Sequence, residues 1–323
     1  MVFSMKIGVF NPLFSDRPFE KFLDMAVKYG LETVEIGTGA YPSDAHAKPK
    51  NLLKDAASLK KFMRVLEDRN LTISALSCHG NMLHPSKTIA QEHHDVHRNT
   101  VLLAERLEVG RVVNFAGCPG DSESAKYPNW VTCAWPPDFQ NVLEWQWKEK
   151  VIPFWKSEAE FADKHGVRIC FEMHPGFVVY NTETLLRLRE AVGKTLGANF
   201  DPSHLFWQGI DPIASIRKLG EAIYHVHAKD VAIDPFNCAL NGVLDTKPYR
   251  DEIARSWIFR TVGYGHGHEF WKNMISALRL VRYDDVLSIE HEDSLMSPRE
   301  GFAKAVSFLK EVILAEKRGK TFF

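Results

Sequence analysis

Cysteine is scarce in this sequence. The 323 residues include only five cysteines, an odd number, and no two of them form a CxxC pair. This usage excludes a disulfide framework and the ligand spacing of a zinc knuckle. We therefore expect reduced thiols and a cytoplasmic protein. The five are Cys78, Cys118, Cys133, Cys170 and Cys238.

Long apolar runs and an excess of one charge are also missing. No stretch of about 18 apolar residues suggests a membrane span. The first residues, MVFSMKIGVFNPLF, have no apolar stretch after a basic start, so they do not resemble a secretory signal. The formal net charge is -1, so no global field recruits nucleic acid or an anionic membrane. An apolar fraction of 45% with 25% charged residues is typical of a globular chain with a sizeable core.

Short runs with strand character alternate with amphipathic helical patterns along the chain. Parallel strands need such helical crossovers, so the rhythm predicts a parallel sheet. An open doubly wound sheet would carry a glycine fingerprint after its first strand, and VFNPLF has no glycine. We predict an α/β protein with one (β/α)8 TIM barrel domain over residues 1–323. The expected strands are 6–10, 33–37, 72–77, 111–117, 168–173, 196–201, 223–230 and 286–292.

Two long insertions interrupt this rhythm. Residues 118–147 are rich in proline and tryptophan, and residues 232–262 are rich in turn formers. Both follow predicted strands, so we expect both on the catalytic rim of the barrel. Trp145 and Trp147 lie on a helical pattern, which favours a packing role for them over contact with substrate.

Four late strands end in acidic or imidazole side chains, in the motifs CFEMHP, NFDPSH, HVHAKD and SIEHED. The steps between successive candidates are 29, 26 and 63 residues. The first two equal about one βα unit, and the third equals one unit plus the second insertion. This spacing predicts four side chains at one height around the barrel mouth: Glu172, Asp201, His227 and Glu290.

Three carboxylates held together would repel one another unless a cation neutralised them. Three oxygen donors and one imidazole suit Mn²⁺, Mg²⁺ or Co²⁺ better than a thiolate-preferring metal. We predict one divalent ion held by these four residues, with Mn²⁺ as the first choice.

The chain resembles the xylose isomerase-like TIM barrel superfamily, also called the sugar phosphate isomerase/epimerase family. The motifs FEMHP, NFDPSH, HVHAKD, RTVGYGHG and LSIEHED carry the resemblance, which covers nearly the whole chain. It implies that the four predicted ligands hold the family's metal. It also implies that His204, three residues after Asp201, contacts the substrate oxygens.

The same resemblance implies a reaction. Family members abstract a proton next to a carbonyl, and the metal acts as a Lewis acid for the developing cis-enediolate. Glu172 and Glu290 would remove and return the proton as catalytic residues, and His204 would steady the enediolate oxygen. We therefore predict a metal-dependent sugar isomerase or epimerase.

Two departures keep other reactions open. The ketose 3-epimerases carry a second glutamate and an arginine where this chain has Val178 and Ile233. HVHAKD instead resembles the inosose dehydratase branch, so a lyase or dehydratase that acts on a keto-sugar, a 3-keto-glycoside or an inosose by β-elimination is the alternative. An endonuclease of the endonuclease IV type is a third reading, which the near-neutral charge disfavours.

Further polar residues at predicted strand ends are candidates for substrate contacts. Lys229 is either a second electrophile or an ion-pair partner of Asp230. Glu35 either contacts the substrate or holds a ligating histidine. Arg260 and His266 flank a glycine turn that would suit an anion. The small-molecule sugar is the expected partner, a homo-oligomer is possible, and the candidate substrate contacts are His204, Lys229, Glu35, His79, Asn81, Arg260 and His266.

Overall fold

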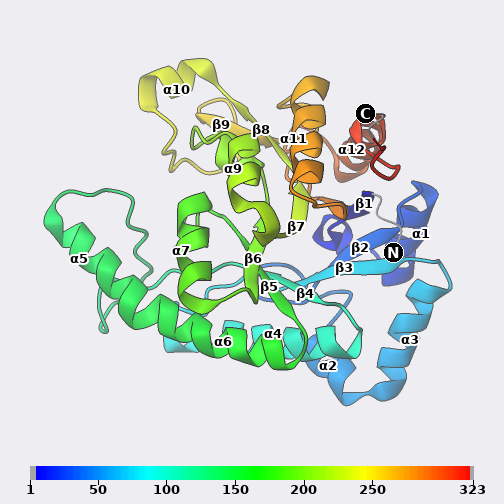
Figure 1. The fold of residues 1–323 in the computed structure, drawn as a ribbon, viewed down its shortest axis with the longest axis horizontal. Coiled ribbons are helices and arrows are strands. Elements are labelled where there is room, and N and C mark those ends of the chain that lie inside the picture. The colour runs from blue at the N-terminus through cyan, green and yellow to red at the C-terminus, as the bar shows by residue number, and fades with distance from the viewer. Residues whose placement is uncertain (1–4, 321–323) are drawn as a thin grey trace.

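The computed structural model describes residues 5–320, and it contains eight parallel strands that form a nearly closed barrel (Figure 1). The order around the barrel is β1-β10-β7-β6-β5-β4-β3-β2, and a parallel bridge between Phe10 and Glu35 links the two edge strands. The predicted (β/α)8 fold is therefore confirmed; positions 1–4 and 321–323 of the predicted domain lie outside the described residues. The strands are β1 (Lys6–Val9), β2 (Thr33–Gly37), β3 (Thr72–Ser77), β4 (Arg111–Asn114), β5 (Arg168–Glu172), β6 (Leu196–Phe200), β7 (Ile223–Ala228) and β10 (Val286–Ile289).

Amphipathic helices cover the outside of the barrel. In α1, for example, Phe22, Leu23 and Ala26 are fully buried, and the helix ends before Gly30, whose φ of 74° suits a residue without a side chain. Asn181 begins α7 with a capping box to Thr184. The main helices are α1 (Phe19–Lys28), α3 (Ala56–Glu67), α4 (Lys87–Arg106), α6 (Ile152–Lys164), α7 (Thr182–Val192), α9 (Pro212–Leu219), α11 (His268–Leu280) and α12 (Pro298–Val312). Shorter helical segments are η1 (Asn11–Phe14), α2 (Pro49–Lys54), α8 (Ser203–Phe206) and η3 (Gly220–Ala222).

The first insertion is a loop that leads into a long helical segment. The loop is anchored by Gln146, whose amide donates to the carbonyls of Gly120 and Asn129. Trp147 is buried, as the helical pattern indicated. The helical segment runs through α5 (Pro137–Trp145) and the π-helical η2 (Gln146–Val151) into α6, and α5 projects from the barrel at the left of Figure 1.

The second insertion is a folded excursion. Its strands β8 (Asp230–Ile233) and β9 (Trp257–Arg260) pair antiparallel, and α10 (Pro235–Asn241) lies between them at the upper left of Figure 1. The predicted strand 223–230 is therefore wrong at its end, because β7 stops at Ala228 and the chain then pairs with a different strand. The predicted strands 111–117 and 286–292 also end earlier, at Asn114 and Ile289.

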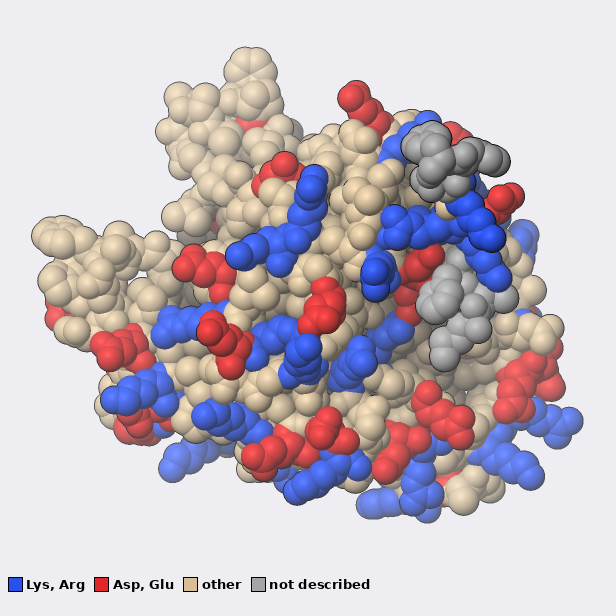
Figure 2. All heavy atoms as spheres, in the orientation of Figure 1, with Lys and Arg blue, Asp and Glu red and all other residues tan. Residues whose placement is uncertain are grey.

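The surface carries charges of both signs. On the face in Figure 2, lysine and arginine side chains stand beside aspartate and glutamate over the body of the barrel, while the two projecting segments are mostly uncharged in this view. Among the described residues, no helix combines the length and the apolar character needed to cross a membrane.

Candidate metal centre

The four predicted ligands meet at the carboxyl ends of their strands. Glu172 is the last residue of β5, Asp201 follows β6, His227 lies in β7, and Glu290 follows β10. One donor atom from each lies within 4.8 Å of the donors of the other three. The register explains the alignment, because Ser288, two residues before Glu290, pairs with His227 across the sheet. Side chains that alternate along a strand thus bring Glu290 to the same end of the barrel.

The geometry inside the cluster fits a cation. Nδ1 of His227 lies 3.2 Å from a Glu172 oxygen and 3.1 Å from a Glu290 oxygen. Nevertheless, Nδ1 of His227 and Oδ2 of Asp201 are buried and make no aligned hydrogen bond. Buried polar atoms without partners are costly. An ion among these donors would satisfy both atoms, so the four residues fit a divalent metal.

Electrostatics lead to the same conclusion. The pKa of Asp201 is raised to about 6, because burial and the neighbouring Glu172 and Glu290 carboxylates together outweigh the opposing effects of His204 and Lys229. Burial also opposes ionisation of Glu290, but Lys229 and His227 hold its pKa at about 2. The site therefore concentrates negative charge that a bound cation would stabilise.

Two further histidines hold Glu172. Nε2 of His204 lies 3.1 Å from Oε1 of Glu172, and Nε2 of His79 lies 3.0 Å from Oε2. Burial opposes ionisation of Glu172, yet His79, together with His204 and His227, keeps its pKa well below the usual range. His79 and His204 thus lie beside the four predicted ligands.

His174 also belongs to this cluster, although it was not among the predicted site residues. It groups with Glu172 and His204 as a possible set of metal-binding donors. Its Nδ1 donates to the Pro175 carbonyl, and burial lowers its pKa to about 3. The side chain is therefore neutral, with Nε2 left as an acceptor. Its position two residues after Glu172, on the same face, was the signal in the sequence.

Lys229 points into the cluster and not toward Asp230. Its ammonium group is buried and lies 3.3 Å from Glu290, 2.5 Å from Glu292 and 3.9 Å from Asp201. The alternative ion pair with Asp230 is not formed. Burial works against the charged form, but Glu290 and Glu292 hold the pKa of Lys229 well above its usual value.

Glu35 lies behind His227 and not in the open part of the site. It is fully buried, and its carboxylate accepts from Nε2 of His227 and from the hydroxyls of Ser77 and Ser288. Of the two partners expected for Glu35, the structure shows the histidine, because Glu35 contacts His227, one of the four predicted ligands.

Arg260, His266 and Asn81 are not brought into the cluster. Arg260 pairs with Asp293, and His266 donates to Asp230 and stacks on Phe206. Asn81 accepts from the backbone N–H of Cys118, donates to its carbonyl and so ties two loops together. The glycine turn is also occupied: the N–H groups of Gly263, Gly265 and His266 all donate to Asp230.

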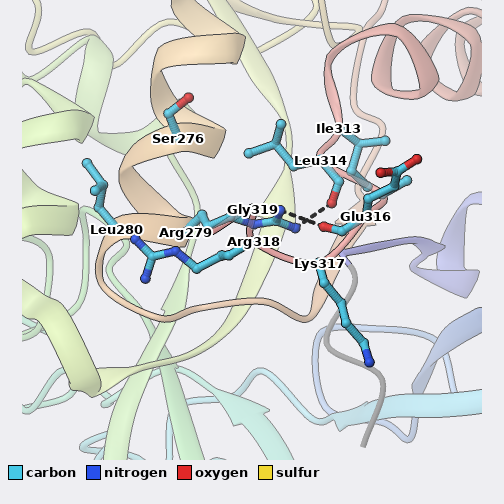
Figure 3. Close-up of a pocket in the computed structure, with 10 residues that line it drawn as sticks. Ser276, Arg279, Leu280, Ile313, Leu314, Glu316, Lys317, Arg318 and Gly319 are labelled. Atoms are coloured by element: carbon cyan, nitrogen blue, oxygen red, sulfur yellow. Dashed lines mark hydrogen bonds between the residues drawn. The ribbon is translucent and has the colours of Figure 1, made fainter. Parts of the chain in front are cut away.

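Several cavities border the cluster. One of about 360 Å³ is lined by Glu172, Glu290 and His79 together with aromatic rings. A second of about 330 Å³ shares His174 and Glu292 with the first. A further cavity of about 640 Å³ lies elsewhere, between the end of α11 and residues 313–319 (Figure 3). There Arg279 donates to the carbonyls of Leu314 and Glu316, and none of the predicted ligands lines it.

The fold is a TIM barrel, and an oxygen-rich cluster that could hold a metal ion lies at the carboxyl ends of its strands. The model of the family described as xylose isomerase-like TIM barrel matches residues 23–312. The chain belongs to this family, and the predicted resemblance is confirmed.

Individual relatives agree with this assignment. The chain is 40% identical over 312 residues to the uncharacterized protein YfiH of Bacillus subtilis, a match that covers 96% of this chain and 99% of the relative. It is 27% identical over 155 residues to an inosose dehydratase of Geobacillus thermodenitrificans, and this match covers about half of each protein, 47% and 50%. The solved structure of IOLI protein with a binding zinc atom superimposes with a TM-score of 0.65 at 19% identity, covering 95% of this chain and 98% of that one.

Proposed function

We propose that this protein is a divalent-metal-dependent enzyme that abstracts a proton next to the carbonyl of a sugar or keto-sugar, with isomerisation or epimerisation as the outcome. One observation carries the proposal: four donors from four strands converge within 4.8 Å, and two of their buried atoms have no hydrogen-bond partner. The sites of TIM barrel enzymes lie at this edge of the barrel.

We propose Mn²⁺ as the ion, with Mg²⁺ or Co²⁺ as alternatives, because three of the four donors are carboxylates. The zinc atom in the IOLI structure supports a divalent metal in this fold without fixing its identity. When bound, the ion would supply Lewis-acid polarisation of a carbonyl oxygen and an adjacent hydroxyl oxygen.

The protein's own groups would move the proton. Glu172 and Glu290 stand three strands apart in the sheet order and line one cavity, so one would accept the proton from carbon and the other would return it. His204, 3.1 Å from Glu172, would donate a hydrogen bond to the substrate oxygen that gains negative charge. His79 would keep Glu172 oriented through its 3.0 Å contact.

A specific observation favours a second candidate, a lyase or dehydratase. The buried ammonium group of Lys229 lies 3.3 Å from Glu290, where it would serve as a general acid. A carboxylate would take the proton from carbon, the C–O bond at the neighbouring carbon would break with its electron pair, and Lys229 would protonate the departing oxygen. The inosose dehydratase relative supports this outcome.

Proton exchange in D₂O tests both candidates. Metal-depleted protein is reconstituted with Mn²⁺ and incubated with D-fructose or an inosose, and the products are followed by NMR. We expect deuterium in the intact sugar if the enzyme isomerises or epimerises, and loss of water if it eliminates. We expect neither in the metal-depleted protein.

Matched variants assign the reaction to this site. Glu290→Gln should abolish exchange, whereas Glu311→Gln, at an exposed glutamate bonded to His268, should not. Full exchange in Glu290→Gln with an unchanged circular dichroism spectrum contradicts the proposal.

A further inference from the structure

The cavity of about 330 Å³ beside the metal centre is lined in part by aromatic rings, and we call it the aromatic compartment. It contains none of the four metal ligands and joins the first cavity at His174 and Glu292. Its walls come largely from the excursion between β7 and α11. The residues that line it are His174, Tyr249, Ile258, Phe259, Glu292 and Ser294.

Two aromatic rings form the main wall of this compartment. The rings of Tyr249 and Phe259 lie 5.6 Å apart at an interplanar angle of 29°. Tyr249 is 57% exposed although its ring is held in place, because the guanidinium group of Arg255 lies over it at 4.5 Å. Arg255 itself is buried and donates to the carbonyls of Lys247 and Trp257. An exposed ring that is fixed from behind is pre-organised for stacking.

Polar partners are few inside the compartment. Glu292 is paired with Lys229, which leaves Ser294, His174 and the hydroxyl group of Tyr249 as the remaining hydrogen-bonding groups among the lining side chains. The hydroxyl groups of a second sugar ring would find few partners here, and their desolvation would be costly. A flat apolar group matches the walls better.

Lys229 marks the boundary between the two spaces. Its ammonium nitrogen lies 3.3 Å from Glu290 on the metal side and 4.2 Å from the ring centroid of Phe259 on the aromatic side. A substrate atom beside Lys229 would therefore join a part held at the metal centre to a part held against the rings.

We propose that the substrate has two parts: a sugar that binds at the metal centre, and an aromatic substituent on that sugar that stacks in the aromatic compartment. This proposal rests on the proposed function for the sugar part. It names the class of substrate, a sugar derivative with an aromatic group attached through a neighbouring oxygen, in place of a free monosaccharide.

Binding of simple glycosides tests the proposal without any turnover. The probes are phenyl β-D-glucopyranoside and methyl β-D-glucopyranoside, titrated into the Mn²⁺-loaded protein and followed by ligand NMR. We expect the phenyl probe to bind about tenfold more tightly, which is the gain that an aromatic contact typically supplies together with its buried area. Tyr249→Ala should reduce this preference to about threefold or less, and Tyr249→Phe should restore it.

Tyr127→Ala is the matched control, since Tyr127 is 78% exposed on the other insertion and lines neither cavity. Equal affinities of the two probes for the wild-type protein, no binding of the phenyl probe, or an unchanged preference in Tyr249→Ala would each overturn the proposal. These results are separable from the proposed function, because deuterium exchange into a keto-sugar is measured independently of the aromatic preference.

Discussion

Both carboxylate oxygens of Glu35 lie 3.0 Å from Nε2 of His227. Glu35 comes from β2 and His227 from β7, so the contact crosses the interior of the barrel. Burial opposes ionisation of Glu35, but His227 and His225 hold its pKa at about 2, which keeps it an acceptor. Glu35 thereby holds the Nε2 side of the His227 ring, so that Nδ1 is the atom that faces Glu172 and Glu290.

Glu35→Gln should therefore weaken metal binding although Glu35 is not a ligand. An amide cannot accept on both atoms, so His227 loses its fixed orientation. Changes to such supporting groups typically cost about 10- to 100-fold in metal affinity. The dissociation constant for Mn²⁺, measured by electron paramagnetic resonance, checks this. Glu105→Gln, at a surface glutamate that contacts His165, is the control. A wild-type affinity in Glu35→Gln would mean that Glu35 serves only the fold.

Lys229→Met should separate metal binding from turnover. The ammonium group lies within 4 Å of Asp201 and Glu290, so it repels a dication bound there. Its removal should tighten Mn²⁺ binding and at the same time lower turnover by about 100-fold, because the acid or electrophile is lost. Metal titration and the deuterium-exchange assay on the same samples measure both changes. Weaker metal binding or wild-type turnover would contradict the assigned role.

His97, which is not one of the clustered residues, makes stability depend on pH. It is fully buried against Trp155, and Glu158 and Asn114 are its polar neighbours. Burial lowers its pKa from 6.5 to about 4. The unfolded chain therefore binds a proton that the folded protein does not between pH 6.5 and 4. The contribution of neutral His97 is present above pH 6.5 and is lost as the pH falls through this window.

The pH dependence of urea unfolding tests this account. His97→Gln should flatten the decline in unfolding free energy between pH 6.5 and 4.5, by about 2 kcal/mol over two pH units. His165→Gln, at a histidine that is partly exposed, should keep the wild-type slope. Parallel curves for the wild type and His97→Gln would refute this account of His97.

Regular spacing made the barrel and the four clustered residues predictable from sequence. Each of the four lies at the end of its own buried strand or directly after it, so local pattern and the length of one βα unit place it at the rim. Long-range pairing was not predictable: Asp230 pairs with Arg260 in the β8–β9 ribbon, and nothing near Asp230 in the sequence identifies that partner.

Contacts between side chains that lie far apart in the sequence could not be predicted either. Glu35 lies in the middle of β2, and only the fold reveals that it faces His227. Arg260 and His266 looked suited to an anion, but the turn between them already binds the carboxylate of Asp230. The sequence shows which residues are polar, and the packing determines which of them remain available to bind a ligand.

The carboxylate group of Asp230 occupies the position in the glycine turn where an external anion would otherwise bind. This buried carboxylate accepts from the N–H groups of Gly263, Gly265 and His266 at 2.9–3.2 Å and from the ring of His266 at 2.8 Å. Asp230→Ala leaves these donors without an acceptor, so it should lower the unfolding free energy by about 3 kcal/mol or more.

Inorganic phosphate should partly rescue the Asp230→Ala variant, because a cradle of N–H groups without its carboxylate becomes an anion site. We expect the melting temperature of the variant to rise with phosphate concentration at constant ionic strength. The wild type should not respond in this way, since its own carboxylate fills the cradle. Asp284→Ala, which removes the partner of Arg279 on another part of the surface, controls for general effects of phosphate. A loss of stability in Asp230→Ala that phosphate does not relieve would show that the turn collapses once its acceptor is removed.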